Sequence, residues 1–286
     1  MSKLFLRVLK KVKLLSYFNL NGKVKLNNLT INIPIIKGIG FYNIYGTEPW
    51  MITLFKEILH LKKDAAYYDI GVNLGQTLIK LRAVNSEIEY IGFEPNPICV
   101  FYSKELIKTN NFKATSIFPV GVSNEDNVYS LSLFSDDDTD SAASMLDNFR
   151  PEQKTFRKEY IPCFEVKKIL EKYRLPKIGI LKIDVEGAEK EVLESFENRI
   201  LTDRPFIQIE ILPVYKEENI ERLHRQMSIE ALCSKLDYSI LRVIKTENGG
   251  FERLQEINTI GIHSNMDWCE YLLVHKSDKM LLKCTT

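Results

Sequence analysis

Four acidic residues stand at the ends of short apolar segments, where carboxylates are unusual. They are Asp69 in YYDIG, Glu94 in IGFEP, Asp184 in LKIDVEG and Glu210 in IQIEI. Parallel strands that helices cover on both faces are normally apolar throughout, and their carboxyl ends line one crevice in which ligands bind. Four carboxylates in one crevice would repel one another unless a cation or several hydrogen-bond donors bound there. This arrangement predicts a site for a ligand that carries positive charge.

A turn with two glycines follows the first of these acids. In YYDIGVNLGQT, residues 67–77, a strand runs into Gly71 and Gly75 and then into a helix. Glycine has no Cβ and tolerates positive φ, so the backbone of such a turn can lie close to a ligand. The pattern is DxGxNxG, which differs from the GxGxxG of turns that bind the pyrophosphate of nicotinamide dinucleotides.

Glu94, which ends the second strand, does not by itself distinguish between two possible cofactors. Glu94 lies 25 residues beyond Asp69 and is placed to accept the ribose hydroxyls of either a nicotinamide dinucleotide or S-adenosylmethionine. S-adenosylmethionine carries a sulfonium and an ammonium but no phosphate. The remaining acids therefore favour S-adenosylmethionine.

The elements that must position these residues begin at residue 65, where short apolar strands and helices alternate regularly. Alternation of this kind predicts a doubly wound α/β sheet that is mostly parallel. We expect its strands at residues 65–69, 89–94, 114–119, 178–186, 206–212, 238–245 and 270–275, with a hairpin at 129–134. The Asp- and Ser-rich run 135–144 predicts a mobile loop or lid.

Residues 1–63 are predicted to form a cap on this domain, which we expect to occupy residues 64–286. Residues 3–18 have the pattern of a basic amphipathic helix, and short β-rich segments and a helix at 50–61 follow. The amphipathic helix has two interpretations at this stage. It packs on the domain or on a second subunit, or it contacts a membrane surface.

Composition argues against several kinds of partner and site. The 286 residues carry a net charge of +1, from 39 basic and 38 acidic residues, which gives no reason to expect nucleic acid as a partner. Four dispersed histidines predict no metal site, and no apolar run suits a membrane span or a signal peptide, so we expect a cytoplasmic protein. Five dispersed cysteines predict free thiols in a reducing compartment: Cys99, Cys163, Cys233, Cys269 and Cys284.

Four motifs taken together resemble a known family. DIGVNLG, FEPNP, LKIDVEGAEKEVL and FIQIEI occur in this order over roughly residues 67–212, and the set resembles the FkbM-type S-adenosylmethionine-dependent methyltransferases. The resemblance implies a Rossmann-like methyltransferase sheet that closes with an antiparallel last strand. It also implies S-adenosylmethionine as the cofactor, and a hydroxyl of a sugar or another metabolite as the acceptor, which would be a small molecule or a glycan. Val72 stands where the family usually has alanine.

The resemblance assigns roles to particular residues. Asp184 and Glu186 alternate at the end of a strand and would face the methyl group or the acceptor, with Asp184 the first candidate for a base and Glu210 behind it. The implied cofactor contacts are Asp69, Gly71, Asn73 and Gly75 around the methionine part, Gln76 and Thr77 at the helix start, Glu94 at the ribose, Asn96 in the same FEPNP motif, and Val122 and Ser123 near the adenine.

Structural interpretations of the same residues stay open. Asp69 could cap its own turn, and Glu94 could belong to a buried ion pair. Glu186 and Glu210 could pair with Lys182 or with backbone donors, and Lys182 could be a partner of Asp184. At the level of function, two alternatives to a methyltransferase remain: a nucleotide-dependent oxidoreductase on a similar sheet, and a non-catalytic membrane-surface adaptor that uses the N-terminal helix.

Overall fold

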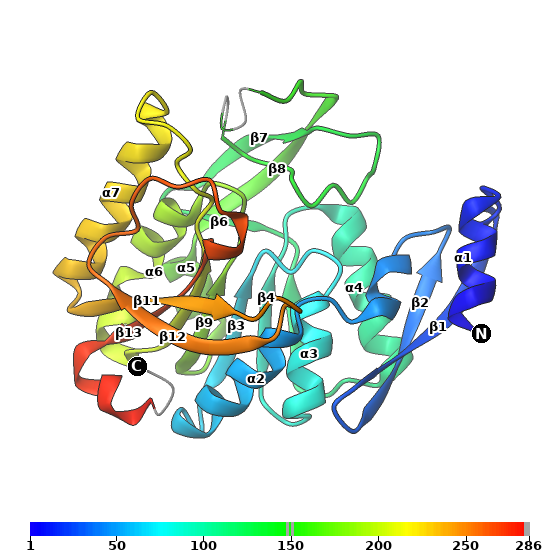
Figure 1. The fold of residues 1–286 in the computed structure, drawn as a ribbon, viewed down its shortest axis with the longest axis horizontal. Coiled ribbons are helices and arrows are strands. Elements are labelled where there is room, and N and C mark those ends of the chain that lie inside the picture. Colours follow the sequence, from blue (N-terminus) through cyan, green and yellow to red (C-terminus); the bar gives the residue numbers. More distant parts are fainter. Residues whose placement is uncertain (147–148, 150–151, 283–286) are drawn as a thin grey trace.

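The computed structural model describes residues 1–146, 149 and 152–282. Within these residues, the largest sheet has eight strands in the order β12-β11-β13-β10-β9-β3-β4-β5 (Figure 1). Five neighbouring strands are parallel: β3 (Ala66–Ile70), β4 (Tyr90–Phe93), β5 (Thr115–Phe118), β9 (Ile178–Ile183) and β10 (Phe206–Glu210). The expected doubly wound, mostly parallel sheet is confirmed.

The last strand of the chain is antiparallel, as expected. β13 (Glu270–His275) lies between β10 and β11 (Tyr238–Lys245) and runs antiparallel to both. In this sheet, the sequence did not predict β12 (Phe251–Ile257), an edge strand with sequence FERLQEI in which only Leu254 is buried. Charged residues are common on exposed edges, and they hide the alternation by which strands are recognised.

Helices cover both faces of this sheet, so its strands must be apolar on both sides. One core lies against α5 (Val166–Tyr173), α6 (Glu189–Asp203) and α7 (Ile220–Lys235), and the other against α2 (Pro49–Ile58) and α3 (Gln76–Val84). Alternate residues of β3 enter the two cores, since Tyr68 and Ile70 pack in the first and Tyr67 in the second.

A second sheet stands beside the carboxyl edge of the first. It has three strands in the described residues, β6 (Gly121–Ser123), β8 (Arg157–Glu165) and β7 (Asn127–Leu133), in that order. The strand expected at 129–134 is β7, but its antiparallel partner is the distant β8. The Asp-rich run 135–144 follows β7 and is folded back on it, where Ser132 and Ser144 form an isolated bridge.

The N-terminal part packs at one end of the molecule, outside α4 (Pro97–Asn110) (Figure 1). It contains α1 (Lys3–Lys11), the hairpin of β1 (Asn19–Leu26) and β2 (Leu29–Ile36), and short 3₁₀ turns at Leu15–Tyr17, Phe41–Tyr45 and Leu59–Leu61. The helix predicted over 3–18 ends at Lys11, because Lys13 adopts a left-handed φ of 59° that interrupts it. Two more 3₁₀ turns, Met266–Trp268 and Lys276–Leu281, flank β13.

Two further features concern the described residues only. No helix among them is both long and apolar enough to cross a membrane. Cys99, Cys163, Cys233 and Cys269 are buried free thiols, and the fifth cysteine, Cys284, lies outside the described part of the chain.

Candidate functional site

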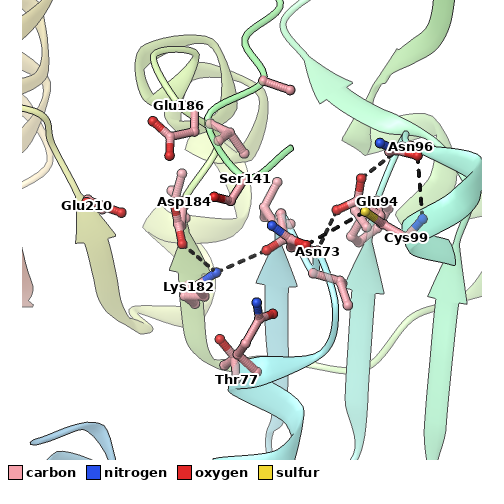
Figure 2. A pocket seen from close by; sticks show the side chains of 18 of the residues that line it. Asn73, Thr77, Glu94, Asn96, Cys99, Ser141, Lys182, Asp184, Glu186 and Glu210 are labelled. Carbon is pink, nitrogen blue, oxygen red and sulfur yellow. Dashed lines mark hydrogen bonds and ion pairs between the residues drawn. The ribbon is translucent and has the colours of Figure 1, made fainter. Parts of the chain in front are cut away.

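A cavity of about 360 Å³ lies at the carboxyl ends of β3, β4, β9 and β10 (Figure 2). This volume is within the range of small-molecule sites. Its walls include the turns that follow those strands, residues of the three-stranded sheet, the loop between β7 and β8 at Asp140 to Met145, and the cap residues Thr47, Glu48 and Met51. The cap therefore contributes directly to the cavity.

Most of the predicted site residues line this cavity, and three do not. Asp69 and Ser123 have no exposed surface, and Gly75 lies behind the turn, where its left-handed φ of 71° starts α3. Ser123 is instead within 3.1 Å of the Tyr129 hydroxyl. The predicted residues that do line the cavity are Gly71, Asn73, Gln76, Thr77, Glu94, Asn96, Val122, Asp184, Glu186 and Glu210.

Glu94 is held as an acceptor by two backbone amides. Its Oε2 accepts from the Asn73 N–H at 2.7 Å and its Oε1 from the Asn96 N–H at 2.8 Å. Burial raises the pKa of Glu94 to about 7, although these two hydrogen bonds oppose the rise. The predicted alternative of a buried ion pair does not apply, because backbone donors occupy the place of a cation. Each oxygen keeps a lone pair for another donor.

Asn96 is engaged in structure rather than free for a ligand. Its side-chain oxygen accepts from the Ile98 N–H at 2.9 Å and so caps α4. Its side-chain nitrogen donates to the Asp138 carbonyl at 2.8 Å. Asn96 thereby ties the Asp-rich loop to the edge of the cavity.

Lys182 connects two of the acids at the centre of the site. Its Nζ lies 3.2 Å from Asp69 Oδ1 and 3.2 Å from Asp184 Oδ2, and it donates to the Gly71 carbonyl at 3.1 Å. Burial alone lowers the pKa of Lys182, but Asp184 and Asp69 raise it well above its ordinary value. The Tyr90 hydroxyl donates to the other oxygen of Asp69 at 2.5 Å. Asp69 thus supports Lys182 from beneath the cavity instead of contacting a ligand.

Gly71 allows the ends of β3 and β9 to approach closely. Its φ is +89°, and a Cβ at this position would lie 1.9 Å from the Asp184 carbonyl oxygen. The Asp184 N–H in turn donates to the Ile70 carbonyl at 3.1 Å. A side chain here would separate the two turns that form the floor of the site.

Several acids line the opposite end of the cavity from Glu94. Figure 2 shows Asp184, Glu186 and Glu210 on this side, and Glu270, which also lines the cavity, is the antiparallel partner of Glu210. Burial, then Asp184 and Glu270, raises the pKa of Glu210 to about 11. Burial also acts on Asp184, but Lys182 lowers its pKa below the ordinary value. At neutral pH Asp184 is therefore the ionised member and Glu210 the protonated one.

Glu186 is not on a strand, which corrects the prediction that residues 178–186 alternate to the end. β9 stops at Ile183, and Glu186 has a left-handed φ of 54° in the turn before α6. The Ser144 hydroxyl donates to the Glu186 carbonyl at 2.7 Å. The Asp-rich loop thus fastens this turn, and both line the cavity.

The lining residues that the sequence did not predict include three with polar side chains: Glu48, Gln208 and Glu270. Glu270 begins an antiparallel strand, whose amino end meets the carboxyl ends of the parallel strands, so the acid at its start should have been counted with the others. Gln208 pairs with Lys182 in register, and its buried Oε1 has no hydrogen-bond partner among the described residues. Glu48 lies in the cap, away from the strand ends, so no sequence pattern indicated that it would line the cavity.

Comparison with known proteins identifies a family that matches most of the chain. The model of the methyltransferase FkbM domain matches residues 69–249. A search of curated proteins found no match.

Two solved structures with similar folds are methyltransferases. Methyltransferase FkbM from Methylobacillus flagellatus KT is 15% identical with a TM-score of 0.45 over 74% of this chain and 43% of that one. Precorrin-6y C5,15-methyltransferase from Geobacter metallireducens GS-15 is 13% identical with a TM-score of 0.41 over 79% of this chain and 87% of that one. The match thus spans less than half the length of the Methylobacillus chain.

Proposed function

This chain belongs to the FkbM methyltransferase family, and from that premise we propose that it transfers the methyl group of S-adenosylmethionine to a hydroxyl oxygen of a sugar or another metabolite. The observation that supports the proposal best is the cavity, which has an anchored carboxylate at one end and a cluster of acids at the other. An adenosine group with a cationic tail has this distribution of donors and charge.

The residues present fit the cofactor. The two oxygens of Glu94 would accept the two ribose hydroxyls, because each still has a free lone pair after its backbone hydrogen bond. Phe93 and Val122 line the same cavity and would hold the adenine by apolar contact. Lys182 brings one positive charge against the two carboxylates of Asp69 and Asp184, so the remaining negative charge beside it would attract the ammonium and sulfonium.

S-adenosylmethionine, when bound, supplies a methyl group on a good leaving group. The protein would therefore contribute mainly alignment, which is worth up to about 7–11 kcal/mol in well-oriented reactions. A hydroxyl acceptor must also lose its proton. Asp184 is our candidate for the group that receives it, since Lys182 keeps it ionised and 37% of its side chain is exposed. Glu210, which is already protonated, would orient the acceptor by donating a hydrogen bond.

The acceptor is proposed to carry several hydroxyl groups. Asp184, Glu186 and Glu210 contribute side-chain oxygens to one side of the cavity, and the Asp-rich loop adds Asp140 and Ser141. Hydroxyls donate hydrogen bonds to such oxygens, and sugars carry many of them. An oxidoreductase has less support, because a dinucleotide pyrophosphate would face carboxylates at this edge.

Calorimetric titration with adenosylhomocysteine tests the cofactor site. We expect binding by the wild-type protein, and about 10- to 100-fold weaker binding by E94Q, because hydrogen bonds to a charged group are lost. The exposed E217Q is the matched control and should bind like wild type. Absence of adenosylhomocysteine binding, with stabilisation by a nicotinamide cofactor instead, contradicts the proposal.

The same titration has an expected pH dependence. The Glu94 carboxyl has a pKa of about 7 in the free protein. Its ionised form accepts hydrogen bonds more strongly than its protonated form. Affinity should therefore rise between about pH 6 and pH 8, and E94Q should remove this rise. The acceptor atom is tested separately by mass analysis of products from candidate sugars: a methyl ether supports O-methylation of a hydroxyl, and a base-labile methyl ester contradicts it.

A further inference from the structure

The N-terminal helix turns apolar side chains toward solvent. Leu4, Phe5, Val8 and Val12 are all exposed, and Leu4 has 72% of its surface accessible. Three more exposed apolar residues, Leu14, Tyr17 and Phe18, follow in the next turns. We refer to these seven residues as the N-terminal apolar face. In Figure 1 α1 is the outermost element at its end of the molecule.

Packing fixes the orientation of this helix, so the exposed side is not a consequence of a loose terminus. Leu6 is fully buried, close to Gly22, Ile35 and Ile44. On the same side, the Lys10 ammonium lies 3.6 Å from the centre of the Tyr42 ring. The rest of the protein covers Leu6 but leaves the side chains of the N-terminal apolar face exposed.

Basic residues border this face in a regular stripe. Lys3, Arg7 and Lys11 are spaced by four residues, and Leu4, Val8 and Val12 form the adjacent stripe with the same spacing. All three basic side chains are exposed. An apolar stripe edged by basic residues is the arrangement of helices that lie in the interface of a membrane.

The part of the cap before Glu48 carries charge of one sign only. Residues 1–47 contain eight basic and no acidic residues, whereas the rest of the chain has 31 basic against 38 acidic ones. All eight basic side chains are exposed: Lys3, Arg7, Lys10, Lys11, Lys13, Lys23, Lys25 and Lys37. The near-zero net charge of the chain therefore conceals a strongly basic end.

We infer that the N-terminal apolar face docks on a lipid surface that carries anionic headgroups, with α1 lying in the plane of the interface. The apolar side chains would enter the acyl boundary, and each basic residue near the headgroups would strengthen binding by about fivefold. Docking would hold the enzyme beside acceptors that are themselves at a membrane.

A second copy of the chain and nucleic acid are less suitable occupants. Two copies that joined through this face would bring their basic stripes together, and like charges oppose such contact. Nucleic acid would satisfy the basic residues but would leave Leu4, Val8 and Val12 exposed to water or against phosphates.

Vesicle co-sedimentation with the full chain tests the inference. We expect binding to vesicles of phosphatidylcholine containing phosphatidylglycerol, at least about tenfold weaker binding to pure phosphatidylcholine, and weakening at high salt. L4S/V8S should reduce binding by about tenfold or more through lost apolar burial. K3E/R7E should abolish the preference for anionic vesicles.

Matched variants control for folding and for general surface change. V128S/Y160S removes two exposed apolar side chains from the three-stranded sheet, and K177E/K216E reverses two exposed charges elsewhere. Both should bind vesicles like wild type, and L4S/V8S should keep the wild-type Tm.

Three results would overturn the inference: no binding of wild type to anionic vesicles at low salt, full binding by L4S/V8S, or an oligomer without vesicle binding that L4S/V8S dissociates. The last result would assign the face to a second copy.

Discussion

The carboxyl groups that line the cavity differ widely in pKa because each has different neighbours. Asp184 has a lowered pKa because Lys182, 3.2 Å away, outweighs the effect of its partial burial. Glu94 is held by neutral amides, which compensate its burial only in part, and its pKa is about 7. Glu210 is buried beside other acids, so its pKa rises to about 11. Assignment of a base therefore depends on neighbours that no motif specifies.

Glu210 should destabilise the ligand-free protein at neutral and alkaline pH. Its pKa is about 4.5 in an unfolded chain and about 11 in the folded one, so the folded state holds a proton that the unfolded state releases. Stability consequently falls as pH rises between these values. Glu210→Gln, which mimics the protonated form, should raise the Tm at pH 8 by about 2–4 °C, equivalent to ~1 kcal/mol. The gain should vanish near pH 4.5.

Thermal unfolding at several pH values measures this effect, with Glu217→Gln as the exposed control. A lower Tm for E210Q at pH 8 would mean that an ionised Glu210 stabilises the fold, which contradicts the proton assignment.

At the scale of elements, the site depends on strand ends that touch one another. The turns that follow β3 and β9 meet at Gly71 and Asp184. Because of this contact, both turns line the same cavity. β13 contributes because it is antiparallel, which places its first residue, Glu270, opposite Glu210. The elements thus bring together Asp184, Glu210 and Glu270, which lie 26 to 86 residues apart in the chain.

Gly71→Ala should be much more destabilising than an alanine substitution at a comparable glycine. Gly38 has a similar φ of +96° with nothing within 4 Å of a Cβ, so Gly38→Ala reports the cost of the left-handed backbone alone, about 1–2 kcal/mol. Gly71→Ala adds a collision with the Asp184 carbonyl and should cost at least about 2 kcal/mol more. Urea unfolding of both variants compares the two values. Equal losses would show that the strand ends can separate freely.

At the scale of the whole molecule, the cap and the sheet domain share a hydrophobic core. Ile33 of β2 and Leu6 of α1 pack in one cluster with Ile79 of α3 and Tyr102 of α4. The cap also supplies Glu48, which pairs with the buried Lys80 at 2.5 Å and lines the cavity. We propose from this that the two parts, divided by sequence near residue 63, fold as one unit.

Ile33→Ala should lower the stability of the entire protein by about 2–5 kcal/mol, because the buried side chain leaves a cavity in the shared core. Leu29→Ala, at a more exposed position of the same strand, should change it little. Unfolding followed by circular dichroism and by tryptophan fluorescence should give coincident transitions for both variants. A separate early transition in I33A would show that the cap unfolds independently.

Local patterns predicted much of this protein because they reflect local physics. The apolar runs located β3, β4, β10, β11 and β13 to within a few residues, since buried strands must be apolar. The glycine turn and FEPNP identified the ends of β3 and β4, and with the two later motifs they indicated the family that the domain match confirms. β12 was missed, since an exposed edge strand needs no continuous apolar run.

The residue types and the neighbouring apolar runs were enough to locate Asp69, Glu94, Asp184 and Glu210 at or beside strand ends. Which acids face the cavity depends on how the elements pack. The tertiary structure buried Asp69 against Lys182, added Glu270 from an antiparallel strand and Glu48 from the cap, and moved Glu186 into a turn. The reason is physical: burial, pairing and pKa depend on the groups that the fold brings within a few ångströms, and these come from distant parts of the chain.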